Sequence, residues 1–97
     1  MDGLQKMINC VLKNTFKELK DAKHYIYLAK EAKELGQVAT ASDFKAIAND
    51  ELKHYDANRK ILNMLLPPEQ KENIFYEMNM QELADMYDDV VKHLSQI

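Results

Sequence analysis

Cysteine, proline and glycine are scarce in this 97-residue chain, and tryptophan is absent. The single cysteine, Cys10, has no second cysteine for an intrachain disulfide, and no Cys-x-x-Cys pair exists to bind zinc or exchange thiols. Two glycines and two prolines leave few places to turn, whereas a sheet needs a turn signal about every 8–12 residues. The composition therefore favours a few long helices in one small domain with a marginal core of its own.

Long apolar runs are missing as well. No segment approaches the roughly 18 apolar residues of a membrane span, and the amino terminus lacks the apolar stretch of a signal peptide. We therefore expect a cytoplasmic protein with no membrane partner. We also expect no nucleic-acid partner, because non-specific binding needs a basic surface and the net charge is −3.

The acidic residues are concentrated in the last third of the chain. Residues 1–66 hold 11 Lys and Arg against 9 Asp and Glu, whereas residues 67–97 hold 2 against 7, a charge of −5. We divide the chain accordingly into a helical hairpin, 1–66, and an acidic C-terminal helical segment, 67–97. A solvated helix face explains this acidity, and the functional alternative is a surface that draws cations toward a site.

Apolar residues recur with helical spacing through most of the chain. The pattern predicts one helix from Leu4 to Leu35, ended by Gly36, and a second from Val38 to Leu66, ended by two prolines. A loop this short makes the two helices antiparallel neighbours.

The acidic segment is predicted to be helical too. We expect a turn or two of helix within Glu69–Glu77. Asn79 and Glu82 resemble a capping box that opens a third helix from Met80 to about Ser95. The predicted fold class is therefore all-α, a long antiparallel helical hairpin plus a short C-terminal helix.

Two glutamates and a histidine interrupt the apolar pattern, and helical spacing places Glu18 in one core-facing stripe with Thr15 and Ala22. Glu51 and His54 form a Glu-x-x-His pair, which places both side chains on one helix face. Glu18 lies about as far before the turn as this pair lies after it, so a rise of 1.5 Å per residue sets all three level to within roughly 1–6 Å. Unpaired carboxylates in a core are costly and need compensation. Carboxylates with one imidazole suit iron or manganese, whereas structural zinc usually recruits thiolates.

Simpler explanations remain open for these residues and their neighbours. A Glu within an apolar stripe often snorkels or pairs with a Lys, and Glu-x-x-His arises by chance in charged helices. Tyr25 and Tyr55 are candidates to line a metal cavity, but core packing is the simpler role. Thr15 and Asn58 lie on the ligand faces, where they either hydrogen-bond the carboxylates or fix the helix register. Asp21 is a candidate additional ligand.

The stretch from Glu18 to His54 resembles the first half of a rubrerythrin, within the ferritin-like di-iron family. Members carry a Glu on one helix and, after 32 intervening residues, Glu-x-x-His on the next, which is the spacing of Glu18, Glu51 and His54. The resemblance covers about 40 of the 97 residues without a gap. Similar residues also stand at Tyr25, Tyr27, Ala29, Ala32, Gly36, Phe44 and Ala48.

This chain departs from the family after the hairpin. Residues 67–97 contain no second Glu-x-x-His, since Val90 precedes His93 by three, and no rubredoxin-like Cys-x-x-Cys is present. The resemblance therefore implies half a site, which a homodimer or a higher even-numbered homo-oligomer completes as a ferritin-like four-helix bundle. Small encapsulated ferritins are similar in plan. Two irons per dimer are implied, with manganese as the alternative metal.

The resemblance also implies an activity. Glu51 would bridge the two metals, Glu18 would be a terminal ligand, and each His54 would bind one iron, so these three residues are both the metal ligands and the catalytic residues. The implied oxidoreductase is either a ferroxidase, in which oxygen or hydrogen peroxide oxidises Fe(II), or a rubrerythrin-like peroxidase that needs an external electron donor. The alternative hypothesis is a non-catalytic helical dimerisation or adaptor module that has lost metal binding.

Overall fold

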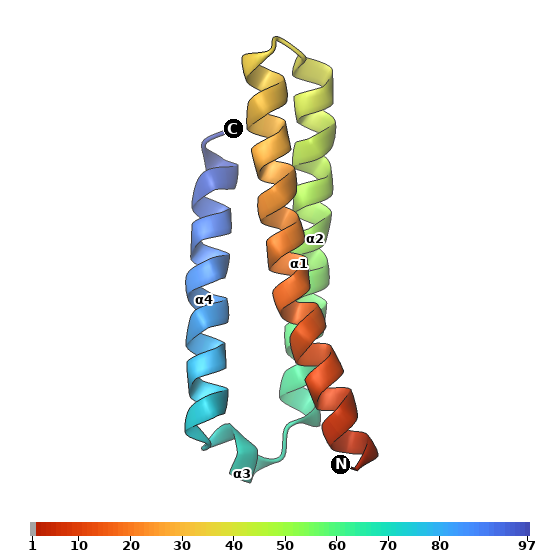
Figure 1. The fold of residues 1–97 in the computed structure, drawn as a ribbon, viewed down its shortest axis with the longest axis vertical. Helices are drawn as coiled ribbons and strands as arrows, with labels where there is room; N and C mark the ends of the chain where they lie inside the picture. Colours follow the sequence, from red (N-terminus) through yellow and green to blue (C-terminus); the bar gives the residue numbers. More distant parts are fainter. Residues whose placement is uncertain (1) are drawn as a thin grey trace.

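The computed structural model describes residues 2–97, which are all-helical with short connections (Figure 1). Helix α1 (Gly3–Glu34) and helix α2 (Val38–Leu65) pack along their lengths as an antiparallel hairpin. A short helix, α3 (Pro68–Lys71), leads to α4 (Ile74–Ser95), which runs back along α1. The hairpin predicted from the sequence is confirmed. Among the helices of residues 2–97, none is long and apolar enough to cross a membrane.

Gly36 ends α1 as predicted. Its φ of +76° lies in the left-handed region, where a residue without a Cβ carries no steric penalty. The amide of Gly36 donates to the Lys33 carbonyl at 3.0 Å, and the amide of Gln37 donates to the Ala32 carbonyl at 2.8 Å. These bonds satisfy carbonyls that the end of a helix would leave unpaired, and they return the chain directly into α2.

The last long helix begins at Ile74, so the predicted start at Met80 is wrong. Its N-cap is Asn73, whose side-chain oxygen accepts a hydrogen bond from the Phe75 amide at 2.7 Å. Asn79 lies inside the helix and is half-buried. The sequence pattern misled because Asn79 has a Glu three residues later, whereas Asn73 caps the helix through its own side chain alone.

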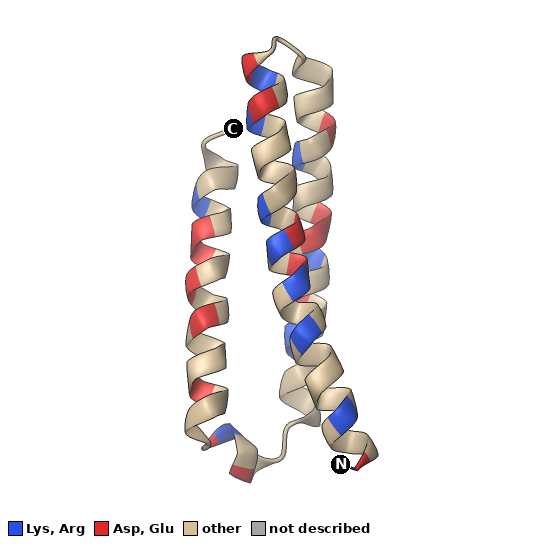
Figure 2. Cartoon of the chain, in the orientation of Figure 1, with Lys and Arg blue, Asp and Glu red and all other residues tan. Residues whose placement is uncertain are grey.

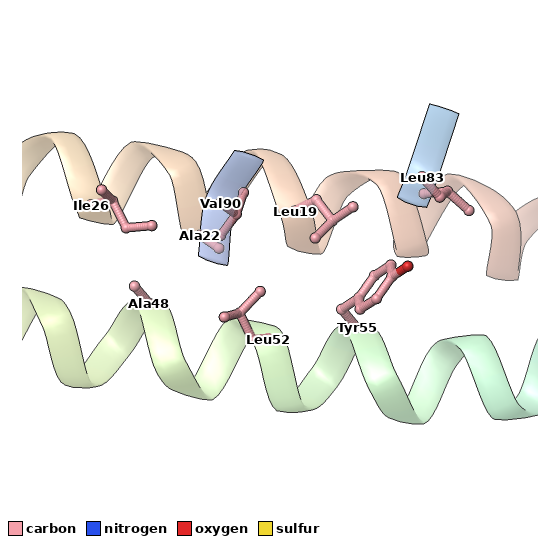
Figure 3. Packing of buried hydrophobic residues seen from close by; sticks show 8 residues of the cluster. All are labelled: Leu19, Ala22, Ile26, Ala48, Leu52, Tyr55, Leu83 and Val90. Atoms are coloured by element: carbon pink, nitrogen blue, oxygen red, sulfur yellow. The ribbon is translucent and has the colours of Figure 1, made fainter. Parts of the chain in front are cut away.

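Helix α4 covers one face of the hairpin. Figure 3 shows side chains of all three long helices converging on one core, which comprises Leu19, Ala22, Ile26, Ala48, Leu52, Tyr55, Leu83 and Val90. The Tyr55 ring stacks on the Tyr87 ring of α4, with centroids 5.2 Å apart. Tyr55 is therefore a core residue facing α4, in agreement with the simpler of its two predicted roles.

Polar contacts fasten the end of α4 to α1. Lys30 Nζ lies 2.9 Å from His93 Nδ1, and Asp89 lies 3.3 Å from His93 Nε2 and 3.5 Å from Lys23 Nζ. Because an ammonium group only donates, Nδ1 accepts from Lys30 and Nε2 donates to Asp89. Figure 2 shows the wider pattern, with acidic positions along α4 and lysine positions along α1. The acidic helix thus docks beside a basic one.

We expect Asn73→Ala to destabilise the protein by about 1 kcal/mol, because it removes the side-chain cap of α4. Asn79→Ala is the matched control and should leave the first turn of α4 intact. Hydrogen exchange of the amides of residues 74–77, together with urea unfolding, measures both effects. Equal losses in the two variants would show that Asn73 does not act as the cap.

Candidate metal centre

The hairpin has a second face that α4 leaves uncovered. Residues at alternating spacings of three and four form one stripe along each helix of this face. The α1 stripe is Leu4, Met7, Val11, Asn14, Glu18, Asp21, Tyr25 and Leu28, and the α2 stripe is Phe44, Ile47, Glu51, His54, Asn58, Ile61 and Leu65. We call these two stripes the open face. Large apolar side chains lie exposed on it, since Leu4 is 46% exposed, Met7 54% and Ile61 43%.

The helical stripe predicted for α1 contained residues of both this open face and the buried face. Thr15 and Ala22 are fully buried, whereas the Glu18 side chain, predicted in the same stripe, retains 20% of its exposure. Glu51 is similar, at 18%. Both carboxylates therefore lie at the edge of the core on the open face, and the prediction that they sit within one core with Ala22 is wrong. The physical reason is that α4, rather than a symmetric partner, covers the Ala22 side of α1.

Glu18, Glu51 and His54 meet in the middle of the open face. His54 Nδ1 lies 3.6 Å from Glu18 Oε2 and 3.8 Å from Glu51 Oε2. One ligand atom from each of the three residues lies within 4.8 Å of the others. Among residues 2–97, these three side chains form the one group of three or more His, Cys, Asp or Glu residues that lie close enough together to hold a metal ion. The level register predicted from the distances to the turn is thus present.

Glu18 strongly perturbs the carboxyl group of Glu51. A hydrogen bond with Glu18, then partial burial, then the charge of Glu18 raise the pKa of Glu51 to about 7, and His54 opposes this shift. Two carboxyl groups this close cannot both ionise cheaply in the absence of a cation. The pair therefore holds a proton near neutral pH, and a bound cation would take that proton's place.

Two neighbouring residues do not join the group. The Asp21 carboxylate accepts from Lys17 Nζ at 2.9 Å on the solvent side of α1, and it is absent from the three-residue cluster. The Thr15 hydroxyl donates to the Val11 carbonyl at 2.7 Å, one turn back on its own helix. Thr15 therefore does not bond a carboxylate, which was one of its two predicted roles.

The donor set fits a divalent first-row metal. Two carboxylates and one imidazole suit iron or manganese, and no thiolate stands among them. Three protein ligand atoms leave half of the positions of a six-coordinate ion unfilled. His54 is the exposed member, with 61% of its side chain accessible, so the cluster is open on the side away from the core. The arrangement is half of a carboxylate-rich site.

We expect metal-free Glu51→Gln to be more stable than the wild type at about pH 8, by about 1 kcal/mol. The folded-state pKa of Glu51 is raised from 4.5 to about 7, so its contribution is fully present below pH 4.5 and is lost as the pH rises through 7. Glutamine cannot ionise and avoids that loss. Urea unfolding at about pH 4 and about pH 8 should therefore show the two proteins converging in acid. Glu31→Gln, at an exposed site on α1, is the control, and a constant difference for Glu51→Gln would contradict the assignment.

In comparisons with known proteins, no family model, no curated protein and no solved structure matches this chain. The resemblance to rubrerythrins therefore rests on the residues between Glu18 and His54, and functional conclusions rest on the geometry of this site.

Proposed function

We propose that this chain is a ferritin-like di-iron protein whose metal site is shared across a homodimer. In this proposal the protein oxidises Fe(II) with oxygen or hydrogen peroxide, as a ferroxidase or a rubrerythrin-like peroxidase. One observation carries the proposal. Ligand atoms of Glu18, Glu51 and His54, which come from two helices, lie within 4.8 Å of one another on a face that α4 leaves open.

The open face supports a second copy as the source of the missing ligands. A two-fold axis through the cluster would bring together four carboxylates and two imidazoles, the ligand set of a di-iron carboxylate bundle. The exposed apolar residues on both sides of the cluster, such as Met7, Ile47 and Ile61, would then be buried. Because the stripes follow heptad spacing, two hairpins can pack knobs into holes as a four-helix bundle.

Each ligand has a distinct task in this proposal. Glu51 interacts with both Glu18 and His54, which suits a bridging carboxylate. Glu18 is hydrogen-bonded to Glu51 in the metal-free protein and becomes a terminal ligand when the proton of Glu51 leaves. His54 turns Nδ1 toward both carboxylates and supplies the nitrogen ligand. When bound, two Fe(II) supply the two electrons that reduce hydrogen peroxide to water.

A non-catalytic dimerisation or adaptor module is the second candidate. The exposed apolar residues of the open face favour it equally, because they fit a dimer with or without a metal. In that case the carboxylate pair would lower the stability of the dimer and serve no function. Metal content of the assembled protein separates the two functions.

Native mass spectrometry after anaerobic loading with Fe(II) tests the proposal. We expect even-numbered assemblies with about two irons per two chains. Glu18→Ala should keep the assembly and lose the iron, because it removes one carboxylate of each half-site but no apolar contact. Glu31→Ala, at an exposed position of the same helix, should keep both. Oxygen and peroxide consumption by the loaded protein then identifies the oxidant.

A dimer that stays free of iron would leave the adaptor function in place of the di-iron one. A monomer, or iron retained in full by Glu18→Ala, would overturn the shared site.

A further inference from the structure

The open face has a polar centre and apolar ends. Its six central positions are polar, three from each helix, namely Asn14, Glu18 and Asp21 in α1 and Glu51, His54 and Asn58 in α2. Apolar residues follow on both sides. Three of the central six form the metal cluster, and Asp21 pairs with Lys17. The two asparagines are not accounted for by the proposed site.

Asn14 and Asn58 belong to one layer of the hairpin. Glu18 contacts His54 across the two helices, with 3.6 Å between Oε2 and Nδ1. Because α1 and α2 are antiparallel, four residues back from Glu18 and four residues on from His54 move the same way, about 6 Å along the axis. These steps end at Asn14 and Asn58. An amide layer therefore lies directly beside the ligand layer, on the side toward α3.

The other side of the ligand layer is different. There the Tyr25 ring of α1 lies 6.2 Å from the Phe44 ring of α2, and Ile47 is the next residue of the α2 stripe. The open face is thus polar in the middle, with amides on one side of the ligands only. The order of polar and apolar layers along this face is therefore asymmetric. A second copy that packs against it buries different pairs of layers in each alignment, so the alignments differ in stability.

We infer that Asn14 and Asn58 are positioning residues that fix the alignment of two copies of this chain, related by a two-fold axis parallel to the helices, so that both their amide layers and their half-sites coincide. This inference rests on the proposed function, because it takes a second copy as the occupant of the open face. A slip by one heptad, about 10.5 Å, would set the amides of one copy against the partner's Met7 and the partner's Leu65, where they lack hydrogen bonds, and would separate the two half-sites. A polar residue at a core position of a heptad specifies register in this way, at a cost in stability.

The ligands alone do not secure the alignment before metal arrives. In the metal-free dimer, Glu18 and Glu51 of both copies would meet around one axis, where like charges repel. Neutral amides both donate and accept, so they pair across an interface without that repulsion. The amide layer would therefore align the two copies first, and the metal would bind between half-sites that already face each other.

The test replaces both asparagines by leucine, as Asn14→Leu/Asn58→Leu, and measures alignment in the metal-free protein. Cys10 is the single cysteine and is exposed on α1, so a spin label there reports the distance between two copies by pulsed electron paramagnetic resonance. The labelled wild type should form the dimer and give one narrow distance. The leucine variant should give a broad or multiple distribution, a dimer dissociation constant about tenfold lower, and less iron per dimer.

A tighter dimer that binds less iron is a combination that simple loss of structure does not produce. Asn63→Leu, at an exposed α2 position outside the stripe, is the matched control and should keep one distance and full iron. Asn14→Gln/Asn58→Gln retains the amides and should restore the single distance if the leucine variant fails to fold. A single unchanged distance with full iron in the leucine variant would overturn the inference alone, whereas a monomeric wild type would overturn the proposed function with it.

Discussion

The approach of Glu18 and Glu51 is the constraint on which the open face depends. Two carboxyl groups in hydrogen-bonding contact at the edge of a core hold a proton near neutral pH, since the pKa of Glu51 is raised to about 7. The carboxyl pair adds nothing to the stability of the hairpin. An apolar residue at either position would instead continue the apolar stripe that the glutamate interrupts. Stability alone therefore does not explain the pair, and a bound cation would offset the unfavourable interaction between the two carboxylates.

The two faces of the hairpin have different roles, since one forms the hydrophobic core and the other carries the candidate metal site. One face is covered by α4, whose Leu83 and Val90 complete a dry core with Leu19 and Ile26. Contacts of His93 and Asp89 with α1 hold the end of that helix in place. The other face keeps the carboxylates, the exposed histidine and several large apolar side chains. Because α4 leaves that face free, a second copy has room to dock without displacing any element of the chain.

The sequence predicted the parts of this structure that depend on local chemistry. Scarce turn residues and helical spacing were sufficient for the hairpin, and Gly36 marked its bend. Equal distances to that bend were sufficient to bring Glu18 level with His54. What the sequence could not predict was the role of α4. Its start was misplaced because two asparagines compete as caps, and the face it covers depends on packing between residues more than sixty positions apart, such as Lys30 and His93. Without that information, the buried and open stripes of α1 looked like one.

The central claim is that two copies of this chain share one site built from Glu18, Glu51 and His54. A crystal structure of the manganese-loaded protein, with the metal located by its anomalous scattering, tests that claim most directly. The account predicts two metal ions between two hairpins, one on each side of a two-fold axis, with the three side chains of each copy directed at them. Density bound to one copy alone, or at another place in the molecule, would contradict it.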